Sequence, residues 1–316
     1  MGWFSKARKT AGWMATSFQG EGVCVAIVSR PSTGLPKVEA VGFSKGKQSQ
    51  WPELLQKIAK DYQAGGYQCT TLLAPSEYQL LSVDAPNVPP EELKTAIRWR
   101  LKDMLDYHVD DATIDVLDVP VDKNGGSRTH SMYAVAARNQ LIEQRQTLFT
   151  DAKIPLTVID IPDMAQRNIS ALLEPEGRGL AMLSFSSEGG LLTVTYQGEI
   201  YLSRRIDISL DQLAQGDADQ RRGLHDRITL ELQRSLDHFD RQYHFVNVPK
   251  LLMAPMGEAG AGLREYLSTN LYIEVDALNL EQVLDLSAVP DLKFLESQQR
   301  FFMTLGAALR HEEKAL

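Results

Sequence analysis

The sequence predicts a two-lobed α/β protein whose second lobe repeats the order of elements of the first. Three observations indicate this. The chain has 316 residues, enough for two domains or one large two-lobed domain. Two segments, at residues 23–83 and 180–275, each begin with strand patterns and continue into a helix and a further strand. Between them, Pro89-Pro90 opens a helix, and we expect a small α+β subdomain inserted in the first lobe.

The first lobe is predicted over residues 21–87. Residues 23–29 and 37–43 have strand patterns, and a Gly-Leu-Pro turn separates them. Residues 51–64 carry apolar side chains at helical spacing, and Gly65-Gly66 ends this helix. Residues 69–73 and 79–83 are predicted as the next strands.

The inserted subdomain is predicted over residues 88–161. Glu91 and Glu92 lie in the first turn of its helix, where carboxylates favour the helix dipole. The expected elements after this helix are strands at residues 113–119 and 131–136, a helix at 139–151 and a strand at 156–161.

The second lobe is predicted over residues 162–316. Its expected elements are strands at residues 180–186, 191–196 and 199–206, a long helix at 219–243, a strand at 250–253, a helix at 259–269, a strand at 273–275 and a last helix at 292–310. We expect the last helix to return to the first lobe. Arg221 and Arg222, at the start of the long helix, are interpreted as part of a solvated face.

Composition and charge limit the possible functions. The net charge of −8 and the pI near 5.4 argue against nucleic acid as a general partner. Cys24 and Cys69 lie in apolar strand patterns without metal-binding spacing, which predicts two reduced core thiols and no metal site. We find neither a leader peptide nor 18 uninterrupted apolar residues, so we expect a cytoplasmic protein.

Residues 1–20 are predicted to form an amphipathic N-terminal arm. Two hypotheses remain open for residues 1–18: an interfacial helix on a membrane, or a helix or arm packed on this protein or a neighbour. Lys6 and Lys9 lie opposite the apolar face. That face contains Trp3, Phe4, Ala7, Ala11, Met14 and Phe18.

The strands at residues 180–206 resemble the second phosphate loop of actin-like ATPases, in particular the PilM proteins of type IV pilus assembly. Further similar segments are Pro90 to Leu117, the sequence Glu-Leu-Gln-Arg-Ser-Leu-Asp-His-Phe at residues 231–239, residues 250–275 and residues 305–310. The resemblance covers nearly the whole chain. It implies a bilobal actin-like fold, which is a duplicated RNase H-like fold with a small inserted subdomain.

The chain departs from the family where the family binds nucleotide. The Asp-x-Gly of the second phosphate loop is replaced by Ser184 and Ser186, although a later Gly is in place as Gly198. Residues 22–38, where we expect the first phosphate loop, contain no acid, and their loop is placed at residues 29–34. Mg²⁺ requires carboxylate oxygens, so we expect no ATPase activity and no bound ATP or Mg²⁺.

The resemblance implies a scaffold of a pilus machine, and the divergent PilM-like component of mannose-sensitive haemagglutinin (MSHA) pili is the most similar subgroup. The implied partners are the cytoplasmic N-terminus of a PilN-like inner-membrane protein, the pilus assembly ATPase and sister subunits in a ring, with the protein peripheral on the inner membrane. The expected remnant of a nucleotide pocket is Ser184, Ser186, Ser187, Gly198, Glu231 and Gly257. The expected partner surface includes Leu80, Val83, Trp99 and Tyr107.

Three alternatives remain open from the sequence. One is an actin-like ATPase that regulates pilus assembly, and a second is the equivalent adaptor of a type II secretion system. The third is an adaptor that binds a membrane surface through residues 1–18.

Two hypotheses also remain open for Trp99, which lies between Arg98 and Arg100: it is either a core anchor or an interface residue.

Overall fold

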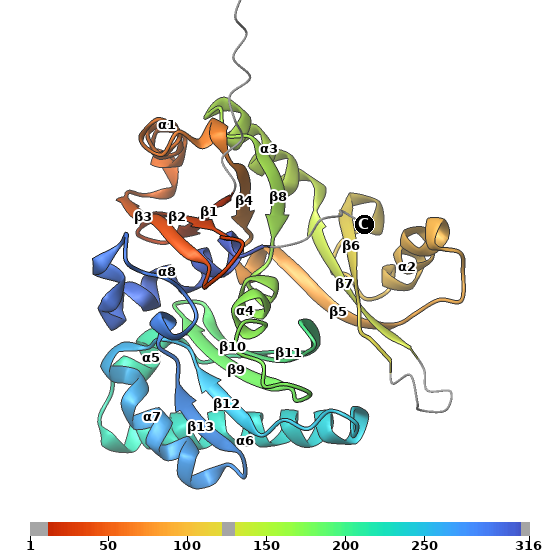
Figure 1. The fold of residues 1–316 in the computed structure, drawn as a ribbon. Helices are drawn as coiled ribbons and strands as arrows, with labels where there is room; N and C mark the ends of the chain where they lie inside the picture. The colour runs from red at the N-terminus through yellow and green to blue at the C-terminus, as the bar shows by residue number, and fades with distance from the viewer. Residues whose placement is uncertain (1–11, 122–129, 311–316) are drawn as a thin grey trace, which may run out of the picture.

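The computed structural model describes residues 12–121 and 130–310. Two five-stranded sheets of the same topology form the two lobes, and a three-stranded sheet projects to one side (Figure 1). The strand orders are β3-β2-β1-β4-β8, β11-β10-β9-β12-β13 and β5-β7-β6. In each lobe a three-stranded antiparallel meander is extended by two parallel strands. The lobes are therefore structural repeats of one another.

The strands of the first lobe are β1 (Trp13–Gln19), β2 (Gly22–Ser29), β3 (Lys37–Lys45), β4 (Gln68–Leu72) and β8 (Leu156–Asp160). Its helices are α1 (Trp51–Asp61) and α3 (Asn139–Asp151), which cover one face of the sheet. The inserted unit contains β5 (Tyr78–Asp84), α2 (Leu93–Leu101), β6 (Ala112–Asp118) and β7 (Ser131–Arg138).

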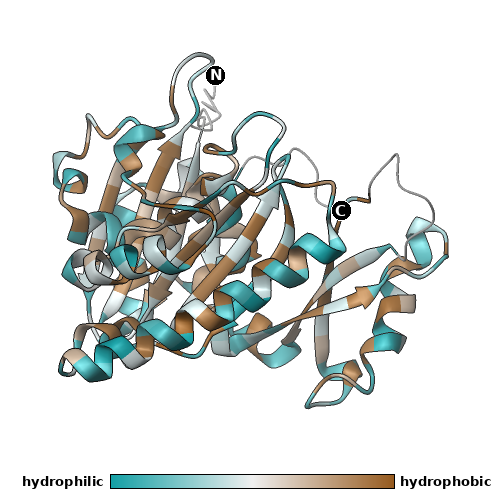
Figure 2. Cartoon of the chain, turned by 90° about the horizontal axis from the view of Figure 1, so that it is seen from below, coloured by the Kyte–Doolittle hydropathy of each residue, from teal (hydrophilic) through white to brown (hydrophobic). Residues whose placement is uncertain are grey.

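The second lobe contains β9 (Leu180–Ser186), β10 (Gly189–Tyr196), β11 (Glu199–Ile206), β12 (Lys250–Met253) and β13 (Glu274–Ala277). Its outer face is covered by α5 (Leu210–Ala214), α6 (Ala218–Gln242) and α7 (Gly257–Asn270). Seen from below, α6 crosses the front of the molecule and alternates between hydrophobic and hydrophilic residues (Figure 2). This pattern is typical of a helix that is half buried.

Two helices cross between the lobes. α4 (Pro162–Ser170) follows the last strand of the first sheet and packs on the second sheet, whereas α8 (Leu295–Ala308) follows the last strand of the second sheet and packs on the first. They contact each other so closely that a Cβ on Gly306 would lie 2.2 Å from the carbonyl oxygen of Ala165. One apolar core contains side chains from both helices and both sheets, so the lobes are packed as one unit.

The structure corrects three expectations. Residues 13–19 are the central strand of the first sheet instead of part of a helical arm, because β1 pairs with both β2 and β4. Residues 1–11 lie outside the described residues.

The other two corrections concern the inserted unit. β5 pairs with β7, so it belongs to the inserted unit, and β8 pairs with β4, so it returns to the first lobe. The predicted boundaries at residues 87 and 161 therefore do not follow the sheets.

Candidate functional site

The hairpins β1–β2 and β9–β10 occupy equivalent positions in the two lobes. In the first hairpin Gln19 pairs with Gly22, and in the second Ser186 pairs with Gly189. Counting back two residues from each turn places Ser17 and Ser184 at equivalent positions on equivalent strands. The candidate site is defined by these two hairpins and the helices α4 and α8 that cross between them.

The predicted position of the first phosphate loop is wrong. Residues 29–34 join β2 to β3, whereas the hairpin equivalent to β9–β10 turns at Gly20-Glu21, at the opposite end of β2. The error follows from the missed strand β1, because without it β2 was taken as the first strand of the lobe. The missed residue is Ser17. Residues 13–19 do not alternate between apolar and polar side chains, since the middle of β1 is buried on both faces, so no period-2 signal marks the strand.

Each hairpin serine is hydrogen-bonded to the crossing helix that packs on its own sheet. The hydroxyls of Ser17 and Thr304 of α8 are 2.7 Å apart. Ser184 donates to Oε1 of Gln166 of α4 at 2.5 Å. Ser17 is 7% exposed and Ser184 is 4% exposed. Both hydroxyls are therefore buried and engaged within the protein.

Gln166 does more than accept from Ser184. Its side-chain amide donates to the carbonyl oxygens of Met182 and Leu191, at 2.9 and 3.3 Å, and to Oγ1 of Thr193 at 2.9 Å. Since Gln166 is fully buried, these bonds satisfy polar groups that would otherwise lack a partner. The glutamine thus ties α4 to two neighbouring strands of the second sheet.

The structure brings four of the six predicted nucleotide-pocket residues to one end of the second sheet. Ser184, Ser186 and Ser187 lie at the end of β9, and Gly257 starts α7 just beyond β12, which is parallel to β9. The hydroxyl of Ser186 bonds within its own turn, to the carbonyl oxygen of Gly189 at 3.2 Å. The amide of Gly257 donates to Oε1 of Gln299 of α8 at 3.0 Å.

The other two residues lie elsewhere. Gly198 is in the turn at the opposite end of β10, with a left-handed φ of 76°, and its amide donates to Glu174 at 2.9 Å. Glu231 is on the exposed side of α6, 3.6 Å from the guanidinium of Arg234. Neither belongs to the same site as Ser184.

A cavity of about 690 Å³ lies between α5, α6 and α7. Burial of the His225 imidazole lowers its pKa from the ordinary value of 6.5, and the nearby Arg221 lowers it further. The rings of His225 and Tyr266 are 5.4 Å apart. Arg221 and Arg222 were predicted to be part of a solvated face. In the structure they also line this cavity. The lining includes Leu213, Ala214, Arg221, Arg222, His225, Glu258, Gly262 and Tyr266.

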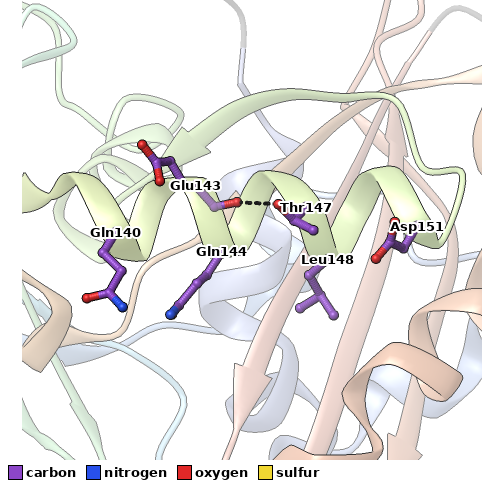
Figure 3. A pocket seen from close by; sticks show the side chains of 6 residues that line it. All are labelled: Gln140, Glu143, Gln144, Thr147, Leu148 and Asp151. Atoms are coloured by element: carbon purple, nitrogen blue, oxygen red, sulfur yellow. Dashed lines mark hydrogen bonds between the residues drawn. The ribbon is translucent and has the colours of Figure 1, made fainter.

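A shallower depression of about 480 Å³ follows the outer side of α3. Figure 3 shows its lining side chains along one side of the helix, with a hydrogen bond from Thr147 to the carbonyl oxygen of Glu143 at 2.8 Å. The side chains are mostly polar and come from a single helix, so the depression offers no set of groups that converge on a ligand.

The predicted partner-surface residues have different environments. Val83 is buried beneath α2 and is not available to a partner, because it packs in the core of the inserted unit. Leu80 is partly buried on the other face of the sheet. Tyr107 lies 4.1 Å beneath the guanidinium of Arg138. Trp99 is 71% exposed, which excludes the hypothesis that it is a core anchor.

A buried polar junction joins the inserted unit to the second lobe. The Asp163 carboxylate, at the start of α4, accepts hydrogen bonds from Tyr78 of β5 and Ser203 of β11. Burial and the Asp163 carboxylate both raise the pKa of the Tyr78 phenol well above its ordinary value. The hydroxyl of Tyr133 accepts from the amide of Ser203 at 3.3 Å, which covers part of the free edge of β11.

Among the described helices, none is long and apolar enough to cross a membrane. Within residues 12–121 and 130–310, no group of three or more His, Cys, Asp or Glu side chains is placed to hold a metal ion.

Solved structures are similar to this chain over nearly its whole length. The structure of a PilM–PilN type IV pilus biogenesis complex matches with a TM-score of 0.74 and 17% identity, over 95% of this chain and 98% of the other. A Bacteroides thetaiotaomicron protein of actin-like ATPase fold and unknown function matches with a TM-score of 0.50 and 10% identity, over 93% and 99%. No family model and no curated protein matches the sequence.

The cytoplasmic domain of EpsL, an inner-membrane component of the type II secretion system of Vibrio cholerae, matches with a TM-score of 0.46 and 15% identity, over 83% of this chain and 96% of the other. The matches with the higher scores show that the fold is actin-like, as the sequence predicts.

Proposed function

We propose that this protein is a scaffold of a type IV pilus assembly machine, of the kind represented by the MSHA pilus biogenesis protein MshI. It docks the N-terminal cytoplasmic peptide of a PilN-like inner-membrane protein, and this partner holds it at the cytoplasmic face of the inner membrane. The pilus assembly ATPase and further copies of the chain complete the machine. The structural likeness to the PilM–PilN complex, together with the inserted unit, supports this proposal.

The single observation that carries the scaffold hypothesis is the pair of buried serines in the two hairpins. A nucleotide-hydrolysing site needs groups that point at the phosphates and a carboxylate that organises Mg²⁺. Here Ser17 and Ser184 direct their hydroxyls to Thr304 and Gln166, within the packed interface of the lobes. The hairpins thus stabilise the contact between the lobes, which suits a protein that presents a fixed surface.

The docking surface is proposed to lie along β5. This strand is an edge of the three-stranded sheet, and its Leu80 and Leu81 are partly buried. An edge strand offers unpaired backbone groups to an extended peptide, and the side chains beside it provide the apolar contacts. Such recognition needs no catalytic residue.

Nucleotide binding without hydrolysis is the second candidate function, and the cavity beside α7 favours it. Arg221 and Arg222 are positive groups suited to phosphate, and the Tyr266 ring is suited to stacking on a base. This hypothesis requires the ligand to bind mainly through α6 and α7, since the hairpin serines are engaged elsewhere.

The docking proposal is tested by calorimetric titration with the synthetic N-terminal cytoplasmic peptide of the PilN-like protein encoded beside this chain. We expect binding, and we expect Leu80→Asp to weaken it at least tenfold because a charge replaces an apolar contact. Leu230→Asp, at an exposed leucine of α6, is the matched control. Absence of binding by the unmodified protein contradicts the proposal, and binding only of a type II secretion peptide assigns it to that machine.

A further inference from the structure

The segment that leads into β5 is held by the first lobe. Residues 75–77 form a short turn of 3₁₀ helix, and β5 begins at the next residue. The Glu77 carboxylate accepts hydrogen bonds from the guanidinium of Arg145 of α3 at 2.8 and 2.9 Å. Arg145 is 5% exposed, and its guanidinium lies 4.4 Å from the ring centroid of Phe18 of β1. This pair fixes the position of Glu77, because separating the two groups would leave a buried cation without a partner.

The next residue, Tyr78, is held by the second lobe. Its hydroxyl donates to the Asp163 carboxylate at the start of α4, and Ser203 of β11 donates to the same carboxylate. Its ring lies 4.4 Å beneath the guanidinium of Arg205, which also donates to the carbonyl oxygen of Pro75. Tyr78 is 5% exposed and Asp163 is 1% exposed, so water cannot readily replace these partners. Two adjacent residues at the start of β5 are thus bound to different lobes.

The side chain proposed to contact the peptide packs beside this junction. Leu80 lies on the same face of β5 as Tyr78, because alternate residues of a strand share a face. Both belong to one apolar cluster, which also contains Ala137 of the inserted unit, Met164 of α4 and Ile200 of β11. A contact at Leu80 and the hydrogen bond of Tyr78 therefore act on the same packed group of side chains.

We propose that Tyr78 and Asp163 are positioning residues for peptide docking, which couple β5 energetically to the second lobe. The inference rests on the proposed docking along β5. An extended peptide pairs best with a strand edge whose backbone is already fixed in the extended state. The hydrogen bond from Tyr78 to Asp163 fixes the start of β5. Without this bond the peptide must order the strand as it binds, which lowers the affinity.

The coupling acts in both directions, because a docked peptide that holds β5 also holds the groups bonded to it. The amide of Ser203 donates to the hydroxyl of Tyr133 of β7 at 3.3 Å, so its exchange with deuterium requires the junction between β11 and the inserted unit to open. We expect peptide binding to slow exchange across residues 199–206, although these residues form β11 and the proposed docking edge is β5.

The test measures peptide affinity and hydrogen exchange on the same variants. Tyr78→Phe removes the hydroxyl and keeps the ring beneath Arg205, and we expect the dissociation constant for the PilN-like peptide to rise about fivefold or more in calorimetric titration. Ser203→Ala removes the second bond to Asp163 from a strand outside β5, and we expect a smaller rise. At saturating peptide, the slower exchange across residues 199–206 should be lost in Tyr78→Phe.

Two controls separate positioning from a general loss of stability. Tyr266→Phe removes the hydroxyl of another tyrosine–aspartate pair, which joins α7 to Asp226 of α6 at the surface, and it should leave docking unchanged. Thr304→Val removes the buried hydroxyl that bonds to Ser17, outside the cluster around Tyr78. It lowers stability without altering the junction, so it should also leave docking unchanged.

Two results overturn the inference while the docking role stands. One is a Tyr78→Phe variant that is folded by circular dichroism and binds the peptide as tightly as the unmodified protein. If this variant does not fold, unchanged binding by Ser203→Ala has the same meaning. The other is slower exchange across residues 199–206 that persists in Tyr78→Phe at saturating peptide, which shows that the peptide covers β11 directly. An unmodified protein that does not bind the peptide contradicts the docking role itself, and the coupling fails with it.

Discussion

The two hairpins of this protein hold a serine in the same place but fix it in different ways. In the first lobe, the hydroxyls of Ser17 and Thr304 bond to each other, and both also interact with the thiol of Cys24 on the paired strand β2. In the second lobe, Ser184 bonds to Gln166, whose amide also donates to Met182, Leu191 and Thr193. The second hairpin is therefore held by an amide that reaches two strands, whereas the first is held by a pair of hydroxyls beside a thiol.

The two lobes therefore keep a shared hairpin structure although different side chains hold the two serines. An acid at either position would be a buried charge and would need a bound cation or another charged partner. Serines carry no charge, and Thr304 of α8 and Gln166 of α4 provide their hydrogen-bond partners. The lobes are joined by packing, by hydrogen bonds and by the ion pair between Asp160 of β8 and Arg310 beyond α8.

The largest predicted effect separates the two crossing helices that hold the hairpins. Gly306→Ala places a Cβ against backbone atoms of Ala165, which cannot rotate away as a side chain can. We expect the free energy of unfolding to fall by about 3 kcal/mol as α8 and α4 separate. Urea denaturation measures this. Gly223→Ala, within α6, is the control, since nothing lies within 4 Å of its Cβ and it should stabilise the helix by roughly 0.5–1 kcal/mol.

The next prediction compares the two hairpins directly. Gln166→Leu leaves several buried polar groups without a partner, so we expect a loss of about 2 kcal/mol in the free energy of unfolding. Thr304→Val preserves the shape of the side chain and removes one hydroxyl partner, so we expect a loss of about 1 kcal/mol. Equal losses in the two variants would show that the network around Gln166 adds nothing to a single bond.

The smallest predicted effect concerns pH and only the second lobe. Folding lowers the pKa of His225, so the unfolded chain binds its proton more readily. The free energy of unfolding should therefore decrease as the pH falls through 6.5 towards the pKa in the folded state. Urea denaturation between about pH 5 and pH 8 measures the slope. His225→Gln should reduce it, and an unchanged slope would contradict the burial of this imidazole.

The sequence predicted local elements better than it predicted their pairing. Helix α3 and strand β12 begin and end at the predicted residues, because their periodicity and their flanking turns agree. By contrast, β5 and β8 were placed in the wrong units, since a sheet partner distant in sequence leaves no local signal. Strand β1 was missed because its residues, together with those before it, also fit one face of a helix.

The candidate site was predicted in part for the same reason. The position of Ser184 at the end of a strand that leads into a hairpin was predicted, and the replacement of an acid there is what the family resemblance implies. Its equivalent, Ser17, and the partners Gln166 and Thr304 lie on elements that meet only through the repeated topology. Gly198 was included because of its distance along the sequence, although an eight-residue strand separates it from the turn at Ser186.

The most direct test of this account measures release of phosphate from Mg·ATP by the unmodified protein and by Ser184→Ala. Since the hairpin serines are bound to the crossing helices and carry no charge, we predict no release above background and no difference between the two proteins. Release that depends on Mg²⁺ and is lost in Ser184→Ala would contradict the account, because it would show that the second hairpin still acts on phosphate.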